Sequence, residues 1–107
     1  MQLPAPIRAY FDADQAPGGA APVGMFTHNA VVRDEGKTHT GREAISDWWN
    51  AAKAKYHHTA VPSEIREKKR NTIVRATVTG QFPGSPAILT FSFQLDDGLI
   101  AALEISA

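Results

Sequence analysis

Two stretches in the second half of the chain alternate between apolar and polar side chains, the pattern of a β-strand with one buried face. In residues 72–81 the even positions are mostly apolar, and in residues 89–95 the odd positions are apolar. Asp96-Asp97-Gly98 is a strong hairpin signal and leads into a last strand, residues 100–106. We expect that strand to place Ala101, Leu103 and Ile105 on one face.

The first half of the chain shows helical spacing in two places. Residues 7–14 suit a first helix, with Pro6 in the first turn where a missing N–H costs nothing. Apolar residues then recur at helical intervals through residues 44–55. Thr40, with Glu43 three residues later, is expected to cap that second helix as a capping box.

Shorter strands are expected between and after these helices. Residues 30–34 and 38–40 form a predicted strand pair around the turn at 35–37. Residues 59–65 read as a strand that Pro62 interrupts, which favours an edge position or a bulge. The proline- and glycine-rich stretch 16–24 breaks regular structure.

This order of elements predicts an α+β fold. Helices come first, and three or four long strands joined by short turns follow, so the helices are expected to pack on one face of an antiparallel sheet. The sheet must curl to enclose them. At 107 residues the chain has room for one domain, residues 1–107.

Composition excludes several classes of partner. Eleven basic and eleven acidic residues cancel, so no net field would gather a nucleic acid. The absence of cysteine excludes disulfides and thiolate metal sites, and the four histidines lack ligand spacing, so no metal is expected. No segment resembles a signal peptide or a bilayer-spanning helix. We expect a cytoplasmic protein without a membrane partner.

Three segments carry a resemblance to a known family: IRAYFDAD, MFTHNAVVRDEGKTHTGREAI and LDDGLIAALEI. Over nearly its whole length the chain resembles the nuclear transport factor 2-like superfamily and its SnoaL-like domains, with a distant similarity to ketosteroid isomerases. The resemblance implies a cone-shaped, cystatin-like fold, in which a curved antiparallel sheet wraps around the N-terminal helices. It also implies a homodimer through the outer sheet face, which is expected to be flat and uncharged apart from Arg75.

Asp34 is the strongest candidate for a catalytic group. If Val32 faces the core, strand alternation places Asp34 on the same inward face and turns Arg33 away. Desolvation would raise the pKa of this carboxylate toward that of a general base useful at neutral pH. In the alternative interpretation Asp34 sits partly wet at the strand end and caps the following turn.

Tyr10 and His58 are weaker candidates. Tyr10 matches the isomerase tyrosine that donates a hydrogen bond to a developing oxyanion, although a buried aromatic at the core boundary would look the same. His57 and His58 are adjacent, so only one can face a pocket; Tyr56, His58 and Asp34 would then form an acid–base set. Such a histidine pair more often only covers the end of a helix.

The match to the isomerases fails at the second oxyanion donor. The corresponding inward position is occupied here by Phe91, and positions of supporting tyrosines carry Phe26 and Trp49. A steroid isomerase is therefore not expected. An apolar pocket is expected instead, lined by Phe26, Val32, Trp49, Phe82, Phe91, Phe93 and Leu103.

Two interpretations of function remain from the sequence. The first, slightly favoured, is a binding module for a small hydrophobic or ring-containing metabolite, because few polar groups are expected inside the cone. The second is a cofactor-free isomerase, cyclase or dehydratase that uses Asp34 as general base and Tyr10 as hydrogen-bond donor. The polar content of the cavity separates them.

Overall fold

The computed structural model describes residues 1–107 as two helices and a six-stranded sheet. In chain order the elements are α1 (Ala5–Gln15), a short 3₁₀ turn η1 (Val23–Met25), β1 (Phe26–Asp34), β2 (Lys37–Thr40), α2 (Arg42–Tyr56), β3 (Thr59–Lys68), β4 (Asn71–Thr79), β5 (Ala87–Asp96) and β6 (Leu99–Ser106). The predicted α+β class is confirmed.

The sheet has the order β2-β1-β6-β5-β4-β3. It is mixed, because β1 and β6 run parallel while every other neighbouring pair is antiparallel. The expectation of a purely antiparallel sheet was therefore wrong for one pair. After β2 the chain passes through α2 to the far edge and returns strand by strand, so β6 closes against β1 in the same direction.

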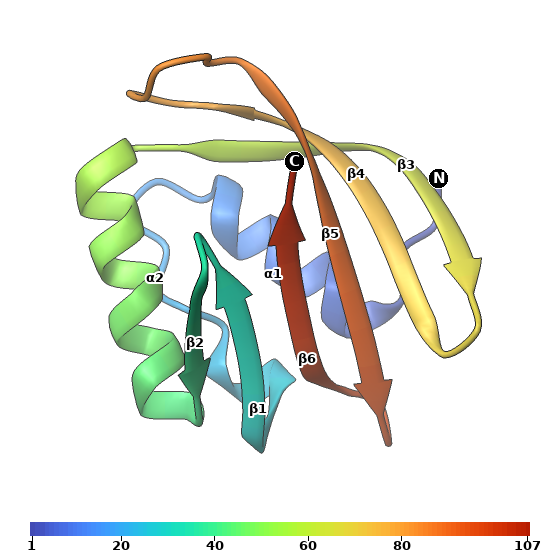
Figure 1. The fold of residues 1–107 in the computed structure, drawn as a ribbon. Coiled ribbons are helices and arrows are strands. Elements are labelled where there is room, and N and C mark those ends of the chain that lie inside the picture. Colours follow the sequence, from blue (N-terminus) through green and yellow to red (C-terminus); the bar gives the residue numbers. More distant parts are fainter.

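The sheet curves around the two helices (Figure 1). Strands β3 to β5 bend over α1, while α2 stands against β1 and β2 at the other edge. A single cluster of buried apolar residues fills the space between the helices and the concave face. In β4, Thr72, Val74, Ala76 and Val78 are buried, as the alternating pattern predicted.

Three local predictions can be compared directly with the structure. Pro62 lies in edge strand β3 next to a register shift, as expected. The capping box is not formed: Gly41 is the N-cap of α2 with φ of 91°, and no side chain caps it, because Thr40 is still paired in β2. The predicted face of β6, with Ala101, Leu103 and Ile105, was wrong at its start. The pairing skips Ala101, and Ile100 is the residue that is fully buried in the core beside Leu103.

Candidate functional site

A cavity of about 370 Å³ lies between the two helices and the concave face of the sheet. Two exposed residues, Glu35 and Pro83, are among those around it, so the cavity meets solvent on their side. Its lining consists of Tyr10, Asp14, Asp34, Glu35, Trp48, Ala52, Tyr56, His58, Val78, Phe82, Pro83, Leu89, Phe91 and Ile105. Apolar atoms dominate the wall, and the polar groups are few and specific.

The structure brings together the three candidate polar residues, Tyr10, Asp34 and His58, at this cavity, with Phe82 and Phe91 beside them. The other five expected pocket residues do not line it. Phe26, Val32, Trp49, Phe93 and Leu103 are instead packed in the core. The pattern of inward-facing residues identified the buried face correctly, but most of that face is filled by neighbouring side chains and only one end of the cone is hollow.

Asp34 ends β1 and is half-buried. Its Oδ2 atom accepts a hydrogen bond of 3.1 Å from the indole N–H of Trp48 on α2. Burial raises the pKa of Asp34, the Trp48 hydrogen bond lowers it, and the nearby Glu35 carboxylate raises it again. The net effect is a raised pKa, the direction that a general base acting near neutral pH requires.

Tyr10 lies on α1 and is 3% exposed. Five aromatic rings surround it at centroid distances of 5.2 to 6.4 Å: those of Phe11, Phe26, Trp49, Phe91 and Phe93. Burial, followed by the negative charges of Asp14 and Asp34, raises the pKa of its hydroxyl well above the usual value. Tyr10 therefore stays protonated and can act only as a neutral hydrogen-bond donor or acceptor.

His58 follows α2 immediately before β3. Its Nδ1 atom is buried and has no hydrogen-bond partner in the protein, while its Nε2 atom lies 3.7 Å from Asp14 Oδ1. Burial and the neighbouring Lys53 ammonium lower the pKa of His58, so the imidazole is uncharged at neutral pH. The contact with Asp14 is then polar rather than an ion pair. His57 is the exposed C-cap residue of α2.

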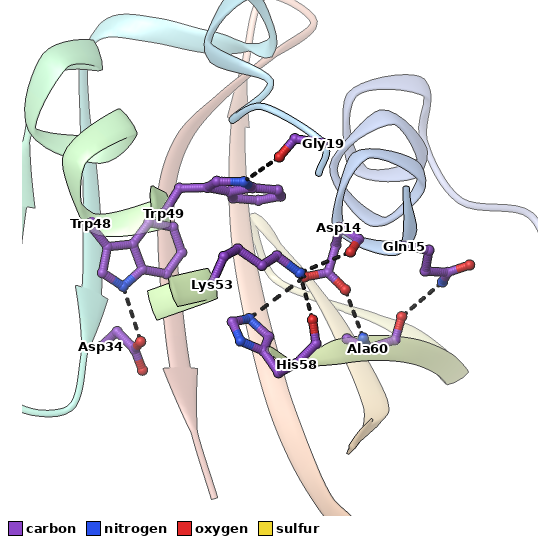
Figure 2. A network of polar contacts seen from close by, with 9 residues as sticks. All are labelled: Asp14, Gln15, Gly19, Asp34, Trp48, Trp49, Lys53, His58 and Ala60. Atoms are coloured by element: carbon purple, nitrogen blue, oxygen red, sulfur yellow. Dashed lines mark hydrogen bonds and ion pairs between the residues drawn. The ribbon is translucent and has the colours of Figure 1, made fainter. Parts of the chain in front are cut away.

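A buried network that the sequence analysis missed holds His58 in place (Figure 2). Lys53 reaches from α2 and donates to Asp14 Oδ1 at 2.6 Å, to the Asp14 carbonyl at 2.8 Å and to the His58 carbonyl at 2.7 Å. The other Asp14 oxygen accepts the Ala60 N–H at 2.6 Å. Asp14 is 4% exposed and joins α1, α2 and the start of β3.

Helical spacing contained a signal for this network. Ile7, Tyr10, Phe11 and Asp14 follow the intervals of one helix face, and all four are buried. An acidic residue at the end of such an apolar face requires a buried partner, because an unpaired buried carboxylate is costly. The partner itself, Lys53, is 39 residues away, and only the folded chain identifies it.

Gly80 allows the end of β4 to approach this network closely. A Cβ atom there would lie 2.7 Å from the Tyr56 carbonyl oxygen and 2.9 Å from the His58 Cα. The N–H of the next residue, Gln81, donates to that same Tyr56 carbonyl at 2.6 Å. The backbone around His58 is thus fixed from both sides.

Where the cavity meets solvent, at its mouth beside Glu35, the Tyr56 hydroxyl donates a 2.7 Å hydrogen bond to Glu35 Oε1. The two residues come from the end of α2 and from the β1–β2 turn, and both line the cavity.

No group of three or more histidine, cysteine, aspartate or glutamate side chains is arranged to hold a metal ion. Neither helix has the length and apolar character to cross a membrane.

Comparison with known proteins identifies close structural relatives. A provisionally assigned polyketide cyclase from Sinorhizobium meliloti has 46% identity and a TM-score of 0.91, over 97% of this chain and 95% of that one. A protein with a ketosteroid isomerase-like fold from Catenulispora acidiphila, solved with trimethylamine, has 18% identity and a TM-score of 0.84, over 99% and 87% of the two chains.

A SnoaL-like protein, also provisionally assigned as a polyketide cyclase, from Jannaschia sp. CCS1 has 18% identity and a TM-score of 0.74 over 94% of this chain and 81% of its own. No protein-family model and no curated protein matches the sequence. The similarity in fold and the 46% sequence identity, both over nearly the whole chain, point to the same relative, the protein from Sinorhizobium meliloti. The chain belongs to the same family as the provisionally assigned polyketide cyclase from Sinorhizobium meliloti and has the SnoaL-like fold of the nuclear transport factor 2-like proteins.

Proposed function

We propose that the protein is an enzyme that moves protons on a small, mostly apolar, ring-containing molecule, as an isomerase, cyclase or dehydratase. One observation carries this proposal: a half-buried carboxylate with a raised pKa, a buried phenol and an imidazole with an unpaired nitrogen all line one apolar cavity. Perturbed titratable groups that converge in a cavity are typical of active sites. A binding module would need none of them.

Asp34 is the proposed general base. Its ionised carboxylate takes a proton from a carbon next to a carbonyl and becomes a carboxylic acid, while the electron pair of the C–H bond moves toward the carbonyl oxygen. Tyr10, which remains protonated, donates a hydrogen bond to that oxygen as negative charge develops on it. Return of the proton to another carbon would complete an isomerisation.

His58 is the proposed second acid–base group. With Nε2 next to Asp14 Oδ1, the tautomer that carries its proton on Nε2 is favoured, which leaves the Nδ1 lone pair as an acceptor. Because Nδ1 is buried in the free protein, the proposal requires the His58 ring to turn toward the cavity, where Nδ1 can take the proton of a substrate hydroxyl or relay it to a leaving group. In an isomerisation every step is a proton transfer. In a dehydration the C–O bond also breaks and the leaving hydroxide takes the relayed proton to become water, so neither reaction requires a redox cofactor.

The charges around the cavity define the ligand further. The cation next to it, Lys53, is occupied by three oxygen atoms, and His58 is uncharged at neutral pH. Asp34 and Glu35 supply the unpaired charge, which disfavours an anionic ligand. Tyr10, Phe82 and Phe91 supply flat apolar surface suited to a ring. The proposed substrate is therefore an uncharged cyclic ketone or alcohol.

Titration of the Asp34 carboxyl carbon by NMR tests this proposal first. We expect a pKa clearly above the reference value of about 3.9, because burial is the largest influence on it. A panel of uncharged cyclic ketones in deuterated water should then show enzyme-dependent deuterium uptake next to the carbonyl. The rate should rise as pH rises through the Asp34 pKa, because only the ionised form accepts a proton. A normal pKa, with ligand binding and no exchange, would favour the binding module.

We also propose a homodimer through the outer sheet face. Val61 and Ile88 are 57% and 54% exposed, and both are in register with Thr77, so they lie in one row across β3, β4 and β5. The face is less neutral than the sequence suggested, because the register also places Glu64 beside Arg75 on it. Isologous contacts can pair such opposite charges across a two-fold axis.

A lysine in this row, in place of Ile88, should weaken the dimer. We expect the wild type to sediment with twice the chain mass of 11.6 kDa and Ile88→Lys to shift toward the monomer, because an ammonium would be desolvated in the contact. Ala51→Lys, on the exposed side of α2, is the matched control. A wild type that remains monomeric at high concentration contradicts the proposal.

A further inference from the structure

Trp48 makes the one hydrogen bond that the protein gives to the Asp34 carboxylate. Its indole N–H, from α2, lies 3.1 Å from Oδ2 at the end of β1. The other oxygen, Oδ1, has no protein partner, and it is not among the buried unpaired atoms. The two oxygens of this carboxylate are therefore not equivalent: one is held, and one remains accessible to solvent or a ligand.

The Trp48 ring is itself held from two sides. The His39 ring of β2 lies over it with a centroid distance of 6.1 Å and a tilt of 33°, and Trp49 meets it edge to face at 6.3 Å. Trp48 also lines the cavity next to Asp34. A ring packed in this way keeps its N–H pointing in one direction.

We propose that Trp48 is a positioning residue for Asp34. The Trp48 indole N–H fixes Oδ2 of Asp34, so that Oδ1 of Asp34 is the atom presented for proton transfer. This role rests on the proposed function of Asp34 as base. A free carboxylate at a strand end rotates about its Cβ–Cγ bond, and a single rigid donor removes that freedom. A hydrogen bond to the ionised form also stabilises it, opposing the effect of burial.

Other groups also face Asp34 and must be kept constant in a test. Glu35 follows it on the chain, His39 comes from β2, and His58 precedes β3. Tyr10 on α1 is close enough for the Asp34 charge to act on its hydroxyl. Trp48→Phe leaves all four groups in place and removes the donor, together with the part of the indole ring that a phenyl ring does not replace.

The test compares Trp48→Phe with Trp49→Phe by carboxyl-carbon NMR titration of Asp34. Both substitutions remove an indole N–H from α2, but that of Trp49 donates to the Gly19 carbonyl at 3.0 Å and does not touch Asp34. We expect the Asp34 pKa to rise by about one unit in Trp48→Phe, the size expected for a hydrogen bond to a charged acceptor. It should stay within a few tenths in Trp49→Phe. An unchanged pKa in Trp48→Phe would overturn the proposal.

A second measurement needs no substitution at Trp48 and covers the case in which that variant does not fold. The chain has two tryptophans and thus two indole N–H signals. One should shift with the Asp34 titration and lose that shift in Asp34→Asn, while the other stays constant. If neither indole N–H signal shifts as Asp34 titrates, the proposal is also overturned.

These outcomes can be distinguished from failure of the proposed function. If the carboxyl and indole signals titrate together and no ketone exchanges deuterium, the contact stands and the catalytic proposal fails. If exchange is found, Trp48→Phe should lower kcat about tenfold with little change in KM, because the ring positions the base rather than the substrate. A loss confined to KM would assign Trp48 to ligand binding instead.

Discussion

Asp34→Asn is expected to lower the rate of proton transfer by about 10²–10⁴-fold, the usual contribution of a positioned general base. An amide cannot accept the proton, whereas its oxygen can still accept the hydrogen bond from Trp48, so the local structure should persist. The measurement is deuterium uptake into a cyclic ketone under saturating conditions. Asp47→Asn, at an exposed position of α2 outside the cavity lining, is the control and should retain most of the rate.

The same substitution should not destabilise the fold. The pKa of Asp34 in the folded protein is raised above its value in the unfolded chain, which is ordinarily about 3.9, so between these two pKa values the native state binds more protons than the unfolded chain. Stability therefore falls as pH rises through that window and remains lower at neutral pH. Asn removes this cost, and we expect stability at pH 7 to be unchanged or higher by up to about 1 kcal/mol. A loss above about 2 kcal/mol in urea unfolding would assign Asp34 a structural role.

Asp14→Ala should be among the most destabilising substitutions in the chain. It leaves the Lys53 ammonium without its carboxylate and the buried Ala60 N–H without an acceptor. Breaking a buried pair by removing one partner typically costs about 3–5 kcal/mol. For a domain of this size we expect the melting temperature to fall by roughly 4–8 °C for each kcal/mol lost. Calorimetry or urea unfolding measures the change.

Two further variants show whether the loss comes from the network. Asp12→Ala, at an exposed position of the same helix, should change stability by less than about 0.5 kcal/mol. The double variant Asp14→Ala with Lys53→Met should lose less than the sum of the single variants, because no uncompensated charge remains. Strict additivity, or a loss below about 1 kcal/mol in Asp14→Ala, would show that the network contributes little.

Local patterns predicted those parts of the fold that depend on short stretches of chain. The inward face of β4 was clear because Val74, Ala76 and Val78 alternate with polar residues. Pro62 indicated an edge strand because a proline cannot donate to a neighbouring strand. The parallel pairing of β1 with β6 was not predictable in this way, because the direction of a strand depends on the path of the whole chain.

The residues of the candidate site also fall into two groups: those that local patterns predicted and those that only the folded chain identified. Strand alternation placed Asp34 inward with Val32, and helix periodicity placed Tyr10 toward the core, so both could be named in advance. Asp14 shared the helix face of Tyr10 but went unnoticed among apolar neighbours. Its role became visible only with Lys53, which comes from a different helix.

The sequence by itself determined which residues face inward, because burial follows the period of each element. Only the tertiary structure decided which of them meet the cavity and which are enclosed by the core. Phe91 lines the cavity, whereas Phe93, two residues along the same face of β5, is completely buried. Periodicity assigns both to one face of the strand. The difference arises because the helices cover one end of the concave sheet and leave the other open, which is a property of packing between distant segments.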